Sequence, residues 1–223
     1  MKIKTISTAA LIIVIIGLAY FLINGIMQPV KFEKEYNGRS TQVINKLKDI
    51  RAIQEAFRSK YGHYCGDIDS LVTFAQTDKV LFIQRTGTIP DGKSESQALK
   101  DGDLRKDTVY VSVAEKLYSA VVYQEKKGTI DSLGLFTPKD KINDLKYIPF
   151  SENKEVFKLQ AKMLDRSGTL VPVFEALAPI ETYTKGIKEQ EIINKTADLI
   201  SKNRYAGWKV GDLTQPILDG NFE

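Results

Sequence analysis

The only histidine and the only cysteine of the chain lie two residues apart, as His63 and Cys65, directly after Tyr61-Gly62. A Cys–His nucleophile needs an imidazole that lowers the thiol pKa and a third group that orients the ring. Residues at this spacing can meet in a turn, but the sequence supplies no defined oxyanion site. We interpret the pair as packing in a turn, with a catalytic pair or a metal-binding pair as the alternatives.

Two further segments carry patterns associated with chemistry. Ser151 and Lys154 match the Ser-x-x-Lys signature of penicillin-interacting enzymes, but no Ser-Asp-Asn or Lys-Thr-Gly follows them. In the acidic segment 91–103, Lys93 and Ser96 stand where an EF-hand loop requires a carboxylate and a glycine, which leaves at most a weak surface calcium site. The sequence therefore predicts a non-enzymatic protein with no catalytic residue, no cofactor and no metal ligand.

Composition indicates a globular protein that is close to neutral behind a basic N-terminal segment. Of the 223 residues 43% are hydrophobic and 27% are charged, which is too apolar for a disordered chain. The net charge is +4, and half of it comes from Lys2 and Lys4. Because the rest of the chain is close to neutral, we expect no nucleic-acid partner.

An uncharged apolar segment covers residues 6–27. As a helix it would extend about 33 Å, enough to cross a hydrocarbon core of roughly 30 Å. Lys2 and Lys4 before it favour a cytoplasmic N-terminus. We expect residues 1–29 to form a cytoplasmic tip and an uncleaved signal-anchor helix whose partner is the lipid bilayer. The alternatives are a cleaved signal peptide and a buried helix.

This prediction makes the chain a single-pass protein of a bacterial inner membrane, with residues 30–223 exported to the periplasm. Apolar residues at helical spacing predict an amphipathic helix over 40–61, capped by Ser40 and ended by Gly62. Pro29 and Asn37-Gly38 predict a break between this helix and the span.

One face of the predicted helix is apolar, and we expect it to pack on the chain's own sheet, with a partner interface as the alternative. Its members are Leu47, Ile50, Phe57 and Tyr61. The residues expected on the opposite, charged face are Lys46, Lys48, Asp49, Arg51, Glu55 and Arg58.

The remaining elements predict an α+β fold: an N-terminal transmembrane helix, a long amphipathic helix packed on an antiparallel β-sheet, and a further C-terminal helix. Asp67 or Asp69 is expected to cap a short helix ending near Ala75. The other expected elements are strands at 80–83 and 109–113, a flexible loop at 87–106, a strand end or edge at 147–150, a hairpin over 157–176 with Pro172 at an edge or bulge, and a helix at 188–203. Trp208 is expected to be half-buried, with an exposed anchor for a partner or glycan as the alternative.

The order of elements resembles type IV pilins and the pseudopilins of type II secretion. The residues that carry the resemblance are Leu47-Lys48-Asp49-Ile50-Arg51, Gln54, Phe57, Tyr61-Gly62-His63-Tyr64 and Asp69-Ser70-Leu71. The whole chain, including 147–150, 172–176 and its Gly-Asn-Phe-Glu end, also resembles single-span envelope proteins of Gram-negative bacteria.

The resemblance implies a membrane-anchored cell-envelope protein with a structural or scaffolding role, in which strands pack on the second half of the long helix. The expected partner is another protein or a second copy. An accessory or binding subunit of a periplasmic secretion or surface-assembly complex is the alternative, and an enzyme acting on peptidoglycan or peptide is the less favoured one.

Overall fold

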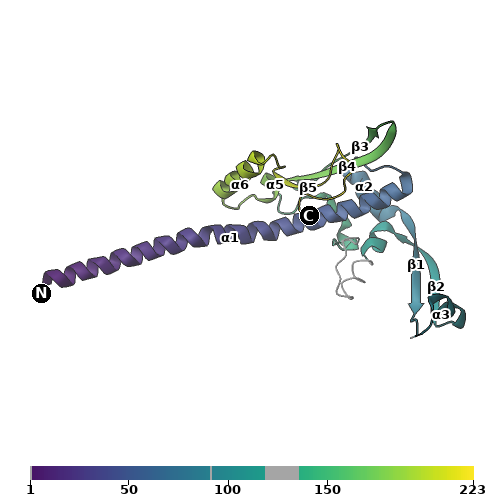
Figure 1. Ribbon diagram of the computed structural model, residues 1–223, viewed down its shortest axis with the longest axis horizontal. Helices are drawn as coiled ribbons and strands as arrows, with labels where there is room; N and C mark the ends of the chain where they lie inside the picture. The colour runs from purple at the N-terminus through teal and green to yellow at the C-terminus, as the bar shows by residue number, and fades with distance from the viewer. Residues whose placement is uncertain (1, 91, 119–135) are drawn as a thin grey trace.

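A computed structural model describes residues 2–90, 92–118 and 136–223. It confirms an α+β chain with a long apolar N-terminal helix, antiparallel sheets and further helices. Figure 1 shows the N-terminal half of the long helix projecting alone, while the other elements gather along its C-terminal half. We call these gathered elements, apart from residues 79–112, the head.

The long helix α1 (Lys2–Tyr61) is continuous over 60 residues, with Pro29 inside it. The predicted break at Pro29 and residues 37–38 is therefore wrong, and Ser40 is a buried interior residue instead of a cap. Packing explains the difference, because Phe32, Tyr36 and Ser40 recur every four residues and are all buried. Contacts with the head thus begin within one turn of Pro29 and outweigh the local preference for a turn.

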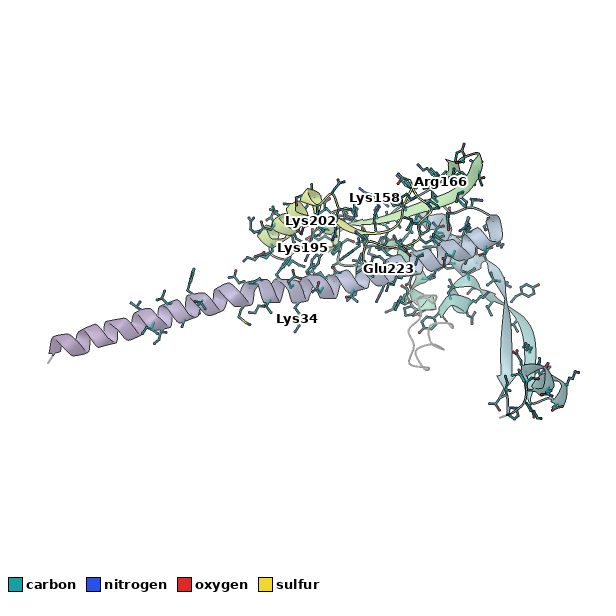
Figure 2. All side chains as sticks on the ribbon, viewed as in Figure 1. Lys34, Lys158, Arg166, Lys195, Lys202 and Glu223 are labelled. Atoms are coloured by element: carbon teal, nitrogen blue, oxygen red, sulfur yellow. The ribbon has the colours of Figure 1, made fainter. Side chains whose placement is uncertain are left out.

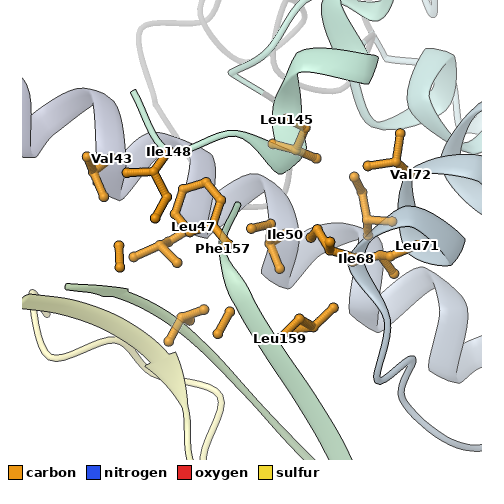
Figure 3. Close-up of a cluster of buried hydrophobic side chains, with 14 of the residues drawn as sticks. Val43, Leu47, Ile50, Ile68, Leu71, Val72, Leu145, Ile148, Phe157 and Leu159 are labelled. Atoms are coloured by element: carbon orange, nitrogen blue, oxygen red, sulfur yellow. The ribbon is translucent and has the colours of Figure 1, made fainter. Parts of the chain in front are cut away.

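The core of the head forms around the second half of α1 (Figure 3). Val43, Leu47 and Ile50 have no exposed surface and lie among apolar side chains from several other elements. Those neighbours include Leu71, Leu145, Ile148, Phe157, Phe174, Ala176 and Val210. The helix is thus the central support of the head, as helix-on-sheet packing requires.

Helix α2 (Ile68–Thr77) follows α1 after a short turn. The Asp67 carboxylate accepts a hydrogen bond from the backbone N–H of Ser70 at 2.8 Å, which selects Asp67 as the N-cap. Leu71, Phe74 and Ala75 are buried on one side of the helix. The predicted short helix is therefore confirmed.

The next three elements form an arm that leads away from the head (Figure 1). Strands β1 (Lys79–Gly87) and β2 (Leu104–Ser112) pair antiparallel over nine positions, and α3 (Glu95–Asp101) lies between them. The loop predicted at 87–106 is therefore wrong in its second half. Ser94 and Gln97 form a capping box and Gly102 adopts a left-handed φ of 81°, so short capping signals define this helix.

The second sheet has the strand order β3-β4-β5. Strands β3 (Lys158–Arg166) and β4 (Thr169–Pro179) form the predicted hairpin, and β5 (Gly207–Gly211) pairs with the second half of β4. Strand β5 pairs only with residues 175–179 of β4, so Pro172 has no neighbour on the β5 side of the strand. The N–H that proline lacks is therefore not needed for pairing on that side. Among the described strands β1 and β2 pair with each other and not with β3, β4 or β5, so the predicted single sheet is two separate sheets.

Other helices of the head are η1 (Lys139–Lys146), α5 (Ile180–Tyr183) and α6 (Glu189–Ser201), and residues 113–118 are also helical. Helix α6 confirms the C-terminal helix predicted at 188–203. The segment 147–150 contributes only an isolated bridge between Tyr147 and Val156.

Candidate membrane and interaction surfaces

The first half of α1 exposes an apolar surface. Helix α1 is long and apolar enough to cross a membrane, and none of its most apolar 18-residue window is buried. The described large apolar side chains of this part are 55–79% exposed: Val14, Ile15, Ile16, Leu18, Tyr20, Phe21 and Leu22. An exposed surface of this kind requires a cover from outside the chain.

The predicted face at 47–61 divides into two parts. Leu47 and Ile50 are fully buried in the chain's own core. Phe57 is half-buried, with its ring centroid 5.0 Å from that of Phe74 and 4.6 Å from that of Tyr61, which is 46% exposed. The structure therefore places the first two residues in packing and leaves only Tyr61 on the surface.

His63 and Cys65 are held apart by their different surroundings. The exposed His63 ring lies against Phe57, and its Nδ1 is 3.0 Å from the Tyr61 carbonyl oxygen. The Cys65 thiol donates to the Asp67 carbonyl at 3.2 Å, and burial raises its pKa. A raised thiol pKa opposes nucleophilic chemistry, so both side chains act here as parts of the turn.

The Ser151 and Lys154 side chains do not meet. The Ser151 hydroxyl donates to the Ile148 carbonyl at 2.8 Å and accepts from the Glu155 N–H at 3.0 Å. The Lys154 ammonium lies 5.7 Å from the centre of the Tyr147 ring. Ser151 therefore stabilises a turn, and the match to the enzyme signature has no geometric counterpart.

Two carboxylates of the acidic segment 91–103 are paired with a lysine of the same segment. Asp91 lies outside the described residues. The Lys93 ammonium contacts the carboxylates of Asp101 and Asp103 at 2.7 Å each, which raises the Lys93 pKa. Within residues 2–90, 92–118 and 136–223 no group of three or more His, Cys, Asp or Glu side chains is placed to hold a metal ion.

A buried carboxylate on α1 was not predicted. Asp49 has no exposed surface, and its oxygens accept from the backbone N–H groups of Phe136 and Thr137 and from the Thr137 hydroxyl at 2.6–2.8 Å. Burial raises the Asp49 pKa to about 6 against the lowering effect of these hydrogen bonds. Asp49 thus fastens the start of the segment 136–223 to α1.

Arg51 also departs from the predicted charged face. Its side chain is largely buried, and its guanidinium donates to the Glu223 carboxylate at 3.0 Å. The sequence carried a signal for Asp49 alone, which precedes the buried Ile53 by four residues; Arg51 precedes Glu55, which is only partly buried, by four. Only the elements that fold back onto α1 decide which of these positions is covered.

A groove beside α6 is the surface that sequence reasoning missed. It has a volume of about 710 Å³ and lies between α6 and the segment 181–187. Its floor is apolar (Ile187, Ile192, Ile193, Ala197 and Ile200), and three of its rim residues are acidic (Glu152, Glu181 and Glu189). We call it the α6 groove. Trp208, the other aromatic candidate, is half-buried as expected, with its ring centroid 6.4 Å from that of Phe222.

Comparisons with known protein families, with curated proteins and with solved structures found no match. Functional inference therefore rests on the geometry of the chain itself.

Proposed function

We propose that this protein is a non-enzymatic, membrane-anchored cell-envelope protein with a structural or scaffolding role and a pilin-like architecture. The observation that carries the proposal is the continuity of α1 from its exposed apolar half into the core of the head. A continuous helix fixes both the distance and the orientation of the head relative to the bilayer. Such rigid coupling suits a scaffold, whereas a tethered enzyme needs only a flexible linker.

The proposed topology places the N-terminus in the cytoplasm, the segment 6–27 in the inner membrane and residues 30–223 in the periplasm. Lys2 and Lys4 before the span support this orientation through the positive-inside rule. The structural engagement of Cys65, Ser151 and Asp49 supports a non-enzymatic role, because each side chain with reactive chemistry already stabilises a turn or a segment.

A reporter that is active only in the periplasm, fused after Glu223, tests the topology. We expect it to be active, and the protein to stay in the membrane at its full mass after carbonate extraction. A reporter active only in the cytoplasm would reverse the orientation, and a mass lacking the first 20 to 30 residues would replace the anchor by a cleaved signal peptide.

A flexible insertion tests the scaffolding role. Inserting Gly-Gly-Ser-Gly between Val30 and Lys31 keeps the span and the head but breaks their rigid connection. We expect the variant to behave like a deletion of the gene while remaining folded and membrane-bound. The same insertion in the exposed hairpin turn at Ser167-Gly168 is the control and should be tolerated. A fully functional Val30/Lys31 insertion would contradict the proposal.

The arm supports the second candidate function, an accessory subunit of a periplasmic secretion or surface-assembly complex. It starts at the end of α1 opposite the span and presents exposed apolar side chains such as Tyr110 (68% exposed) and Ile89 (44%). A two-stranded ribbon on its own is marginally stable in water, so a partner that covers it would stabilise it. Deletion of residues 88–103, leaving a short turn, should then release that partner and leave the head folded.

A further inference from the structure

The α6 groove combines an apolar floor with an excess of negative charge, since its lining carries Glu152, Glu181 and Glu189 against Lys185. Ile193 and Ile200 lie seven residues apart on one side of α6 and are 52% and 62% exposed. Glu181 and Glu189 make no ion pair with any described residue, and Glu152 makes only a long one, 3.7 Å, to Lys185. The groove therefore suits an occupant that carries both apolar and basic side chains.

Helix α6 runs along α1 just beyond the apolar segment. The Lys188 ammonium donates to the Gln28 side chain, and the Lys195 ammonium lies 3.1 Å from the Glu33 carboxylate. The two lysines are about 10 Å apart along α6, and their partners are about 7.5 Å apart along α1. The two helix axes are therefore roughly aligned, and the groove lies level with the part of α1 that leaves the proposed span.

The side of α1 that faces away from the head at this level has complementary properties. Its residues, which we call the back face, are Met27, Val30, Lys31, Lys34, Gly38 and Thr41, and all are exposed. Met27 and Val30 are 44% and 57% exposed, and neither Lys31 nor Lys34 is ion-paired with a described residue. At 100° per residue these positions lie opposite the middle of the buried side formed by Phe32, Tyr36 and Ser40.

Gly38 supplies an independent observation. Glycine is, after proline, the least favourable residue inside a helix, and a side chain at this position would meet nothing within 4 Å in its own chain. No contact within the described chain therefore requires glycine here. A neighbouring backbone that approaches α1 closely at this point would require it.

We propose that a second copy of this chain packs the back face of its α1 into the α6 groove. The inference rests on the proposed function, since two copies anchored in one bilayer have parallel α1 helices at equal depth. Equal depth brings apolar side chains against apolar ones, lysines against glutamates, and Gly38 level with the groove. The two surfaces are different, so the contact is heterologous and can repeat from copy to copy.

Crosslinking of the full chain in isolated membranes tests the contact. One copy carries Val30→Cys and one tag, and the other carries Ile193→Cys and a second tag. A short bis-maleimide should join the two tags, well above the background of chains that carry only the buried Cys65. A copy with Thr73→Cys, an exposed position on α2, is the matched control for Ile193→Cys and should stay at background.

Two further changes separate contact from folding. Gly38→Gln in the Val30→Cys copy should reduce crosslinking to background, while the melting temperature in detergent stays equal or rises because the helix gains a better helix former. Lys34→Glu should lower the crosslink yield about threefold, and Glu189→Lys in the other copy should restore it.

The outcomes distinguish the two proposals. Protein that leaves the membrane in carbonate would overturn the proposed function and this inference with it. Protein that stays in the membrane but crosslinks no better than the Thr73→Cys control would overturn this inference alone. Crosslinks found only between two Ile193→Cys copies would show a symmetric contact and would also overturn it.

Discussion

At the scale of single residues, two buried polar side chains on α1 connect distant parts of the chain to the helix. Asp49 receives three hydrogen bonds from residues 136–137. Gln54 makes a reciprocal pair with the backbone of Cys65, donating to its carbonyl at 2.7 Å and accepting from its N–H at 2.9 Å. Both contacts satisfy buried backbone groups that an apolar residue could not satisfy.

The raised pKa of Asp49 predicts a pH dependence of stability. Since the folded-state pKa of about 6 lies above the usual value of 3.8, the folded protein binds the proton more tightly than the unfolded chain does. The contribution is therefore fully present below about pH 4 and is lost as the pH rises through 6, amounting to about 3 kcal/mol. Urea unfolding of the full chain in detergent at pH 4, 5, 6 and 7 measures it.

Asp49→Asn is the control for that measurement, because the amide does not titrate. The difference in unfolding free energy between wild type and variant should change by about 2.5 kcal/mol between pH 4 and pH 7. A difference that is constant across this range would show that Asp49 titrates normally.

Gln54 predicts a cost that its position in the apolar sequence pattern does not suggest. Gln54→Leu suits the surrounding core in size but leaves the N–H and the carbonyl of Cys65 without partners. We expect a loss of about 2–5 kcal/mol in unfolding free energy. Gln76→Leu, on the exposed side of α2, should change stability by less than about 0.5 kcal/mol. Equal effects of the two substitutions would contradict the role given to Gln54.

At the scale of elements, sequence patterns identified what is periodic and missed what is decided by contacts between distant segments. The hairpin of β3 and β4 follows from strict alternation and a glycine turn, and α2 follows from its aspartate cap. The break at Pro29 was predicted from local preference and failed because Phe32 and Tyr36 are buried against the head. Helix α3 was missed because seven residues are too few to show a period.

The same distinction applies to the surfaces. The apolar part of α1 could be predicted directly from the sequence, because residues 6–27 form one stretch of 22 uncharged residues. The α6 groove could not be predicted from the sequence. It forms because the segment 181–187 lies beside α6, and sequence periodicity does not show how two consecutive segments pack against each other. The buried state of Asp49 likewise depends on Thr137, which is 88 residues away.

The predicted apolar face gives a graded test of burial along α1. Leu47→Ala should cost about 2–5 kcal/mol, because Leu47 is fully buried. Phe57→Ala should cost less, about 1–3 kcal/mol, because Phe57 is only partly buried. Thermal melts of the full chain in detergent measure both. A larger loss for Phe57 than for Leu47 would show that the aromatic cluster with Phe74, and not the middle of α1, dominates stability.

At the scale of the whole molecule, the distribution of exposed apolar surface divides the chain. From Phe32 onward one side of α1 is covered by the head, whereas before it the described side chains from 14 to 22 are exposed all round. The exposed apolar surface and the head-facing surface therefore follow one another on a single helix without a linker. This arrangement makes α1 the element on which the packing of the head, the proposed anchoring and the proposed contact between copies all depend.

Because α1 is uninterrupted, the number of residues between its exposed apolar part and the head sets the direction in which the head faces around the helix axis. Each residue added to the helix after the proposed span would turn the head by about 100° around the axis of α1 and move it by about 1.5 Å along that axis. One alanine inserted between Val30 and Lys31 would turn every surface of the head to a new direction. Seven alanines would return the head to within about 20° of its original direction but place it about 10 Å further along the helix axis. If direction matters more than height, the seven-residue insertion will function and the single one will not.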